Sequence, residues 1–386
     1  MMKIMFYCQH ILGIGHLIRS IEIVRGFGQD QVCFINGGQV IEGFPVPEGV
    51  ELINIPAIKT DPEFQELYAV DPALDLEQVK ELRTEQLLQA FDRFEPDVLL
   101  VELFPFGRRR FSFELIPLLE RAQAAGTKIV SSLRDIVVTK QDRQRHEEKI
   151  CRLMNQYFDM LLIHGDPNLI GIEASFSRTQ DLNCEMHYTG YVVQPLPDPS
   201  ATPSDLPLIL VSAGGGRFGH ELLECVAHAS AYLEDTIPHH IQMFAGPFSP
   251  DAVYSRLQEL ASQRRNLTVE RYTPNLLEYM RRAELSISMA GYNTTLNILS
   301  TGVRAMLLPF AGNGDQEQTL RSGRLEELGV VQVIRPAELT PERFAQKVIA
   351  SLSQQPTPHS FDLQGVGKTV ARVRSLAQQP APTTIL

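Results

Sequence analysis

The chain has 386 residues, of which 44% are hydrophobic and 21% charged, a composition typical of soluble globular proteins. Because a single core rarely grows beyond roughly 250–300 residues, this length predicts two domains. The formal net charge of −11 argues against a nucleic-acid-binding protein, which needs a basic surface.

The five cysteines show no metal-site spacing, which indicates reduced thiols. The sequence has no apolar run near the ~20 residues of a transmembrane helix. It also lacks a signal-peptide cleavage region after its first residues. We therefore expect a cytoplasmic protein.

Strands and helices alternate through the first half of the chain. A short apolar strand at 3–8 is followed by a glycine loop and by a helix with apolar residues at helical spacing over 17–27. A loop is expected at 61–73. Further strands are expected at 31–36, 50–55, 97–102, 128–132 and 160–164, and helices at 74–94, 113–125 and 141–157. Such alternation predicts a doubly wound α/β sheet.

Prolines crowd residues 190–207 and exclude a helix or central strand there. The alternating pattern then restarts, with strands expected at 208–212, 241–245, 267–270, 285–289, 305–309 and 330–334, and helices at 221–233, 251–262, 274–283, 316–328 and 341–352. We therefore predict an N-terminal domain at 1–190, a linker at 191–207, a C-terminal domain at 208–352 and a tail at 353–386. The tail has a candidate helix at 366–376.

The stretch from 285 to 318 has the pattern of an anion site. An expected strand stops at Ala290-Gly291, where glycine allows close approach of a ligand. Asn293, Thr294 and Thr295 are expected to supply the N-cap of the next helix. The positive end of a helix dipole and its unpaired N–H groups suit a phosphate.

A polar loop follows the next expected strand. It ends in four side chains whose donors and acceptors match the hydroxyls of a sugar: Asp315, Gln316, Glu317 and Gln318. The alternative for both segments is an ordinary crossover with a polar loop.

A second glycine loop follows the strand at 208–212. It spells GxGxxG at Gly214, Gly216 and Gly219, with Gly215 and Arg217 between them. A dinucleotide site would also need an acidic residue at the end of the next strand, and that strand ends at Ala245 without one. The loop therefore favours a diphosphate over NAD. Arg217 either adds charge opposite the phosphates or is simply solvated.

His16 begins a helix directly after Gly15, at the carboxyl end of the first strand, where ligands bind in open α/β sheets. A helix N-terminus lowers the pKa of an imidazole and keeps it neutral, as a general base requires. A single histidine is nevertheless more often structural. For His10 and His164 we favour that structural interpretation.

The segment FPFGRRRF at 104–111 places three arginines beside phenylalanines. Such a cluster suits an anionic or lipid-linked acceptor at a membrane surface. The alternative, slightly favoured by the residues alone, is a solvated helix start.

The run AGYNTTLNILSTGVRAMLLPF with DQEQ resembles the nucleotide-sugar site of family 28 glycosyltransferases. The resemblance implies the GT-B arrangement, in which two Rossmann-like domains face a central cleft. It implies that the donor diphosphate lies between the loop at 214–216 and the helix start at Gly291–Thr294, with Asp315 and Gln316 on the sugar. His16 would be the base, and a tail helix would return to the first domain.

The same resemblance places Gly13, Gly15, Arg108 and Arg109 on the acceptor side. One position departs from the family pattern. Where relatives carry a glutamate on the ribose hydroxyls, this chain has Asn297, which can bond a diol without charge. Glu317 is expected to share that role.

The expected function is an inverting, metal-independent glycosyltransferase that uses a nucleotide-sugar, of which UDP-sugar is the first choice, and a hydroxyl acceptor. No cofactor and no metal are expected, because no DxD-type site is present. A lipid-linked acceptor would bring the protein to the inner face of the membrane. The alternatives are a sugar-nucleotide hydrolase of the pseudaminic-acid type, a non-hydrolysing epimerase and a non-catalytic sugar-nucleotide-binding protein.

Overall fold

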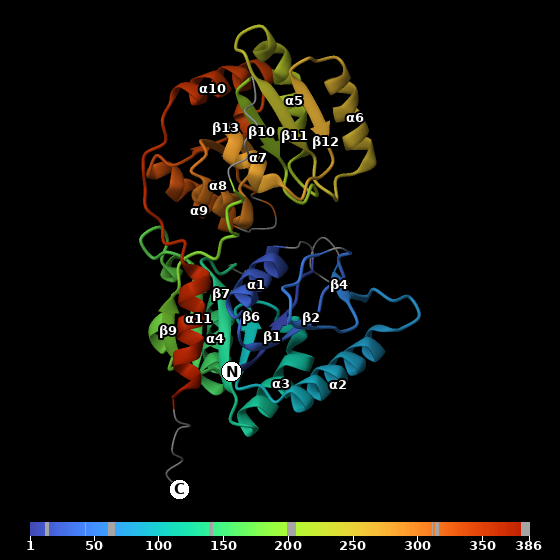
Figure 1. The fold of residues 1–386 in the computed structure, drawn as a ribbon, viewed down its shortest axis with the longest axis vertical. Helices are drawn as coiled ribbons and strands as arrows, with labels where there is room; N and C mark the ends of the chain where they lie inside the picture. The colour runs from blue at the N-terminus through green and yellow to red at the C-terminus, as the bar shows by residue number, and fades with distance from the viewer. Residues whose placement is uncertain are drawn as a thin grey trace. The chain divides into compact units, whose positions relative to one another are not determined.

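The computed structural model describes residues 1–11, 15–42, 44–60, 66–138, 142–198, 206–310, 312 and 316–379. The chain divides into two compact units, one of Met1–Val193 with Asp362–Leu386 and one of Gln194–Phe361. In each unit a parallel sheet is covered by helices on both faces (Figure 1). Each unit is therefore a doubly wound α/β fold.

The sheet of the first unit has the order β3-β2-β1-β6-β7-β8-β9, and every pair in it is parallel. Its strands are β1 (Lys3–Cys8), β2 (Gln31–Asn36), β3 (Glu51–Asn54), β6 (Val98–Glu102), β7 (Lys128–Arg134), β8 (Met160–His164) and β9 (Glu185–Tyr188). A separate antiparallel hairpin pairs β4 (Ile58–Thr60) with β5 (Leu67–Ala69). The expectation of a loop across 61–73 is therefore wrong at β5.

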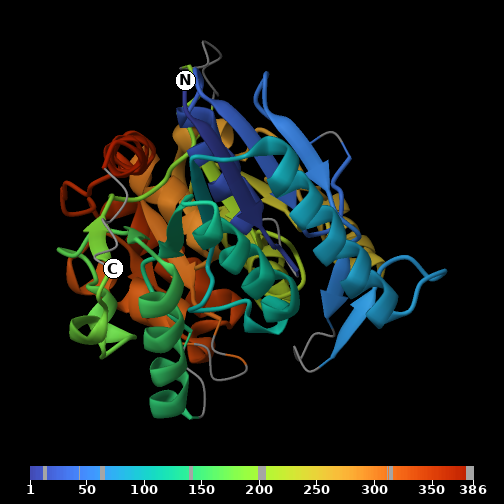
Figure 2. The same cartoon turned by 90° about the horizontal axis from the view of Figure 1, so that it is seen from below.

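Two hydrophobic cores lie on opposite faces of this sheet. Met5 and Tyr7 point into one core, and Ile4 and Phe6 into the other, as side chains alternate along a strand. The first core is covered by α2 (Leu76–Phe94), α3 (Ser112–Ala124) and α4 (Arg143–Tyr157), of which α2 and α3 lie side by side in Figure 2. The second core is covered by α1 (Gly15–Gly26) and α11 (Gly365–Ala377).

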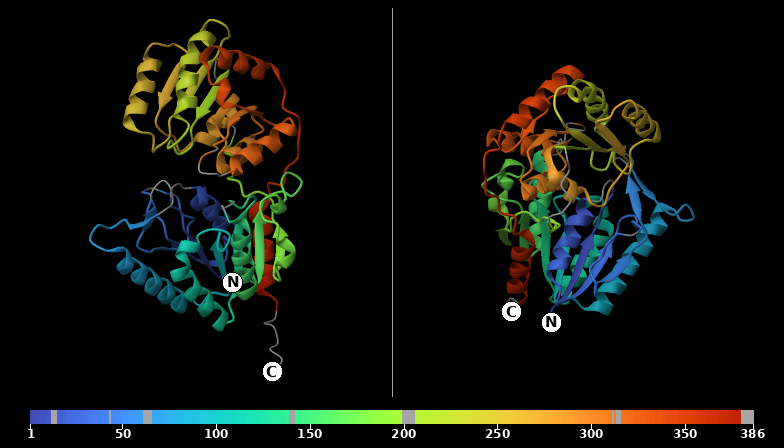
Figure 3. Two further views of the ribbon diagram at one scale, coloured as in Figure 1. Left: turned by 180° about the vertical axis from the view of Figure 1, so that it is seen from behind. Right: turned by 45° about the horizontal axis from the view of Figure 1, so that its top comes forward.

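The C-terminal helix α11 packs along α1, although the two helices lie at opposite ends of the chain (Figure 3). Val370, Val373 and Leu376 are buried in the same core as α1. The two helices approach closely at Gly26, where a Cβ would come within 2.4 Å of the Val366 side chain. From Asp362 onward the tail is therefore part of the first unit, whereas its residues up to Phe361 belong to the second.

The second unit has a six-stranded parallel sheet of order β12-β11-β10-β13-β14-β15. Its strands are β10 (Leu208–Ser212), β11 (His240–Phe244), β12 (Leu267–Glu270), β13 (Ala283–Met289), β14 (Ala305–Leu308) and β15 (Gln332–Val333). Its helices are α5 (His220–Glu234), α6 (Asp251–Ser262), α7 (Leu276–Arg282), α8 (Tyr292–Thr301), α9 (Glu317–Glu327) and α10 (Pro341–Ser353).

One face of this second sheet forms a core with α5 and α10, through Leu222, Val226, Phe344 and Val348. The carboxyl ends of β1 and β6 in the first sheet lie beside helix starts, and so do those of β10 and β13 in the second. Open α/β sheets bind ligands at this edge. Among the described residues, none of the helices has both the length and the apolar character needed to cross a bilayer.

Candidate active site

The helix α1 begins at Gly15, and His16 is its second residue. Its imidazole Nδ1 lies 2.7 Å from Oε1 of Glu102, the last residue of β6. The strands β1 and β6 are neighbours in the sheet, which brings the two residues together. Glu102 is fully buried, whereas the His16 side chain keeps 18% of its surface exposed. We call this pair the His16–Glu102 dyad.

Burial and the charges around the dyad together set its protonation. Burial lowers the pKa of His16 to about 4, opposed by Glu102 and assisted by the cations of Arg108 and Arg134. Burial alone would raise the pKa of Glu102, but His16, Arg19 and Arg108 outweigh it and lower that pKa to about 2. At neutral pH the pair is thus a neutral imidazole held by a carboxylate. With Nδ1–H donated to Glu102, Nε2 is left as the basic nitrogen.

Arg19 supports the dyad from one turn further along α1. Its guanidinium donates a hydrogen bond to the same Glu102 oxygen that contacts His16. Arg19 is buried, so the carboxylate has a permanent countercharge even when the imidazole is neutral.

The other predicted acceptor-side residues have different surroundings. Gly13 lies outside the described residues, and Gly15 is the first residue of α1. Arg108 and Arg109 are half-buried and Arg110 is exposed at the short 3₁₀ turn Arg109–Phe111, which leads into α3, so this helix start is solvated only in part. The Arg109 guanidinium contacts Nδ1 of His146.

The two histidines assigned a structural role are both buried. His164 bonds Ser132 Oγ through Nε2 and Thr189 Oγ1 through Nδ1, each at 2.8 Å, and burial lowers its pKa to about 3. Burial likewise lowers the pKa of His10, whose ring packs directly against Gly38. These surroundings fit the structural interpretation.

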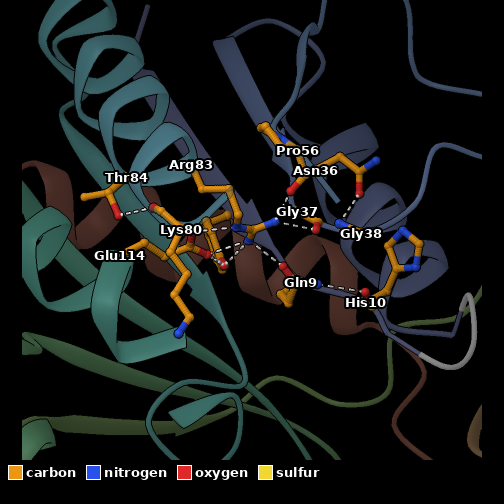
Figure 4. A network of polar contacts seen from close by, with 11 residues as sticks. Gln9, His10, Asn36, Gly37, Gly38, Pro56, Lys80, Arg83, Thr84 and Glu114 are labelled. Atoms are coloured by element: carbon orange, nitrogen blue, oxygen red, sulfur yellow. Dashed lines mark hydrogen bonds and ion pairs between the residues drawn. The ribbon is translucent and has the colours of Figure 1, made fainter. Parts of the chain in front are cut away.

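A buried arginine network fixes the strand ends near His10. All the N–H groups of the Arg83 guanidinium are used: Nε and Nη2 bond the Glu114 carboxylate, and Nη1 donates to the carbonyls of Gly37 and Pro56 at 2.8 and 2.7 Å. Figure 4 shows these bonds converging from α2, α3 and the loops after β2 and β3.

The same guanidinium reaches the end of β1. Arg83 Nη2 donates to Gln9 Oε1 at 2.7 Å, and Gln9 Nε2 donates to the carbonyl of His10 at 2.9 Å. A fully satisfied polar network of this kind rigidifies its surroundings. The ends of β1, β2 and β3 are therefore held as one edge.

In the second unit, the glycine loop after β10 adopts a conformation that other residues rarely adopt. Gly214, Gly216 and Gly219 all have positive φ, at 61°, 82° and 84°. A Cβ on Gly216 would lie 2.5 Å from the carbonyl oxygen of Ala245 in the loop after β11. Only glycine allows these two backbones to pack so closely.

The glycine loop and the start of α8 lie close together. A Cβ placed on Gly214 would be 4.0 Å from Thr294 Oγ1, and one on Gly291 would be 3.9 Å from the same atom. Ala290 is buried, with its amide bonded to the Leu308 carbonyl. These residues come from the ends of β10 and β13, which pair in the sheet.

The cap of α8 differs from the prediction. Gly291 is the N-cap residue, and it has no side chain that could cap the helix. Asn293, Thr294 and Thr295 lie inside the first turn instead, so the expectation that they supply the cap is wrong. A glycine cap leaves the N-terminal N–H groups without a side-chain acceptor from the cap position, which suits an anionic ligand.

The remaining donor residues lie on α8 and at the start of α9. Asn297 is half-buried, and its side-chain amide makes no hydrogen bond to any residue that the structure describes. Glu317 is buried in an ion pair with Arg321 at 2.7 Å, and Gln318 Oε1 accepts the Phe310 amide at 3.0 Å. Gln316 is exposed, and Asp315 lies outside the described residues.

Aromatic rings surround the glycine loop. The Arg217 guanidinium lies 5.0 Å from the centre of the Phe248 ring, and the Phe218 and Phe310 ring centres are 4.5 Å apart. Phe218 and Phe248 are each about half exposed, at 49% and 47%. The exposed arginine is therefore held by stacking on an aromatic ring.

Sequence reasoning missed Glu102, Arg19 and the aromatic contacts. The signal for Glu102 was present, because it is the one charged residue in the otherwise apolar strand VLLVE. Among the described residues, no group of three or more histidine, cysteine, aspartate or glutamate side chains is arranged to hold a metal ion.

Comparison with known sequences finds a family match in the C-terminal half of the chain. Residues 209–372 match the family described as Glycosyltransferase family 28 C-terminal domain. The chain is 25% identical over 190 residues to the UDP-N-acetylglucosamine--N-acetylmuramyl-(pentapeptide) pyrophosphoryl-undecaprenol N-acetylglucosamine transferase of Methylobacterium radiotolerans. That match covers 49% of this chain and 50% of the relative.

A protein of the same name from Thermotoga neapolitana is 30% identical over 83 residues, covering 22% of this chain and 24% of the relative. The chain thus spans about half the length, or less, of these curated relatives. Over this part, the resemblance to family 28 glycosyltransferases is confirmed.

Solved structures resemble the whole chain in fold. The calicheamicin glycosyltransferase CalG4 gives a TM-score of 0.64 at 15% identity, covering 99% of this chain and 100% of the other. MurG of Acinetobacter baumannii gives 0.60 at 15% identity, covering 97% and 100%. At this level of identity the likeness establishes the fold alone, and it confirms the predicted GT-B class.

Proposed function

Because residues 209–372 match a family 28 glycosyltransferase domain, we propose that this chain is an inverting glycosyltransferase. In this proposal it moves a sugar from a nucleotide-sugar, with UDP as the nucleotide, to a hydroxyl group of an acceptor. The donor is assigned to the second unit and the base to the first. The observation that carries the proposal is the 2.7 Å contact between His16 and Glu102.

The donor diphosphate is assigned to the glycine loop and the start of α8. Gly214 and Gly216 turn the loop, and Gly291 opens the helix without a capping side chain. The N–H groups there and the positive end of the helix dipole would stabilise the charge of the departing diphosphate. We propose that these groups stabilise the diphosphate charge without a metal ion.

The ribose and the sugar are assigned to neighbouring residues. The amide of Asn297, which bonds no described residue, is available for the ribose hydroxyls, whereas the Glu317 carboxylate is held by Arg321. The exposed Gln316 and its neighbour Asp315 are assigned to the sugar. In this proposal Glu317 acts on the site indirectly, through its ion pair with Arg321.

Transfer would occur in one displacement. The acceptor oxygen attacks the anomeric carbon while the bond from that carbon to the diphosphate oxygen breaks, and the acceptor proton goes to Nε2 of His16. Glu102 accepts the Nδ1–H, which holds the ring orientation and stabilises the imidazolium that forms. A single in-line displacement inverts the configuration of the sugar.

The proposed acceptor is a compound with a hydroxyl group. One such acceptor is a lipid-linked molecule at the inner face of the membrane. The curated relatives named above act on a pyrophosphoryl-undecaprenol acceptor by name, and this chain matches about half of their length or less. We extend that kind of acceptor to this chain as a proposal, which requires a membrane fraction in the assay.

The test incubates the protein with UDP-, TDP- and GDP-sugars and with soluble and membrane extracts, and identifies products by mass spectrometry. A new glycosylated product with release of UDP supports the proposal. Free sugar without a product would make the protein a hydrolase, and binding without turnover would make it a binding protein. UDP should raise the melting temperature, and NAD should not.

A further inference from the structure

The two helix starts assigned to the donor follow neighbouring strands of the second sheet. The helix α8 begins at Tyr292, after β13, and α9 begins at Glu317, after β14. The strands β13 and β14 pair with each other. The diphosphate is assigned to the first helix start and the sugar to the second. A donor that contacts both is held in a reactive geometry only if their spacing is fixed.

The start of α9 has little local support. Its N-cap residue is the exposed Gln316, whose side chain makes no capping hydrogen bond to any residue that the structure describes. A helix start without a capping side chain is less stable than a capped one. Contacts with other parts of the second unit must therefore hold the first turn of α9, and the bond from the Phe310 amide to Gln318 is one of them.

Arg321 contacts both helix starts. Its guanidinium donates a hydrogen bond to the Glu317 carboxylate at 2.7 Å, one turn back along α9. The same guanidinium lies 4.9 Å from the centre of the Tyr292 ring, at the first residue of α8. An ion pair between residues i and i+4 stabilises its own helix. The contact with a ring of another helix does more, because it joins α9 to α8.

Burial strengthens this contact. The side chains of Arg321 and Glu317 are only 1% and 5% exposed. The attraction between a cation and a ring is larger where water is excluded. On the same helix, Arg324 pairs with Glu327 at the surface, where such pairs contribute little. Arg321 is therefore suited to hold α9 in one place, whereas Arg324 is not.

The first unit contains a similar arrangement. Arg83 is buried, bonds the Glu114 carboxylate and lies 5.3 Å from the centre of the Phe111 ring. There it belongs to the network that holds the ends of β1, β2 and β3 as one edge. In both units, a buried arginine between a carboxylate and a ring thus joins separate segments.

We propose that Arg321 is a positioning residue, which fixes the start of α9 against the start of α8 and so couples the sugar end of the donor site to its diphosphate end. We call the three side chains the Tyr292–Arg321–Glu317 bridge. The words sugar and diphosphate rest on the proposed function, whereas the bridge between the helices does not. Arg321 contacts no substrate in this proposal. It acts through the placement of Gln316, the residue before α9.

The bridge is tested by calorimetry on the full chain, with UDP, UDP-glucose and UDP-N-acetylglucosamine as probes. Tyr292→Leu removes the ring and keeps an apolar side chain. UDP affinity should be unchanged, because the backbone N–H groups of α8 remain. The ratio of sugar-nucleotide affinity to UDP affinity should fall roughly 3- to 10-fold, the effect of losing a cation–ring contact. Tyr292→Phe, which keeps the ring, should restore the ratio.

A double-mutant cycle measures the coupling. Gln316→Ala should lower the ratio in the unmodified chain and should have a smaller effect when Tyr292→Leu is already present, because Gln316 is then no longer held in place. Arg321→Lys, which keeps the charge, should retain more of the ratio than Arg321→Met.

The matched control for Arg321→Met is Arg324→Met, which removes an exposed arginine from the same helix and should leave the ratio unchanged. Three results would overturn the proposal: an unchanged ratio in Tyr292→Leu, an equal loss of UDP and sugar-nucleotide affinity, or additive effects of Tyr292→Leu and Gln316→Ala.

A measurement without ligand separates this proposal from the proposed function. Amide hydrogen exchange in the first turn of α9 should become roughly 3- to 10-fold faster in Tyr292→Leu and should stay the same in Arg324→Met. If no nucleotide binds, the proposed donor site fails, and hydrogen exchange still decides whether the bridge holds α9. Unchanged exchange in Tyr292→Leu would overturn the bridge.

Discussion

His16 and Glu102 are 86 residues apart in the sequence, and their side chains meet at 2.7 Å because β1 and β6 are neighbours in the sheet. If Glu102 orients the imidazole and stabilises its charged form, Glu102→Gln should lower turnover by roughly 10²-fold, within the range of general-base catalysis. UDP affinity should be unchanged, because the donor is assigned to the other unit. Kinetics beside a UDP titration measure both, and unchanged turnover would remove Glu102 from the mechanism.

Asn297 is expected to bind the ribose. Asn297→Ala should weaken UDP binding by roughly 3- to 10-fold, the effect of losing one neutral hydrogen bond. Calorimetry with 2′-deoxy-UDP provides the control, because a ligand without the hydroxyl should bind the variant and the unmodified chain equally. If both ligands lose the same affinity, Asn297 acts elsewhere than on the 2′-hydroxyl.

The buried Arg83–Glu114 pair makes a strong stability prediction. Arg83→Met leaves the Glu114 carboxylate buried without its countercharge, which should lower the free energy of unfolding by about 3–5 kcal/mol. Arg121→Gln breaks an exposed pair and should cost about 1 kcal/mol or less. Urea denaturation of the two variants compares them, and equal effects would show that burial does not matter here.

Two buried histidines predict how stability depends on pH. The pKa of His16 is lowered to about 4 and that of His164 to about 3, from a usual value of 6.5. Between pH 6.5 and the lowered pKa of each histidine, the unfolded chain binds more protons than the folded chain. The part of the folding stability that comes from these neutral histidines is therefore fully present above pH 6.5 and is lost as the pH falls. The loss should be roughly 2–3 kcal/mol per histidine by pH 4.5.

Glu102 does not mask this effect, because its pKa is lowered to about 2 and its own contribution is lost only below pH 4.5. Urea denaturation between pH 7.5 and 4.5 measures the slope. The slope should be shallower in His164→Gln, which cannot titrate. An equal slope in that variant would mean that His164 is not held neutral by the fold.

Much of the fold was predictable because buried parallel strands are continuous apolar runs. The strands at 3–8, 31–36, 160–164, 208–212 and 267–270 have the predicted bounds. The edge strand β9, with the sequence EMHY, was not predicted, and neither was β5. Both are short, and neither is fully buried, so neither has an apolar run to reveal it.

The parts of the candidate site that come from one local segment could be predicted from the sequence. The contacts between distant segments could not. The GxGxxG spacing indicated the turns at Gly214 and Gly216. It could not indicate that Ala245 of the next loop packs on Gly216, because that contact depends on sheet order. Glu102 stood out as the one charged residue of its strand. Its contact with His16 could not be predicted, because no local pattern tells which strand lies beside β1.

The most direct test of the central claim is the turnover of the His16→Ala variant in the transfer assay, measured on folded protein that still binds UDP. The account predicts a fall of roughly 10²–10⁴-fold, because a neutral imidazole held by Glu102 takes the acceptor proton. Turnover equal to that of the unmodified chain, per folded molecule, would show that His16 is structural and would contradict the mechanism.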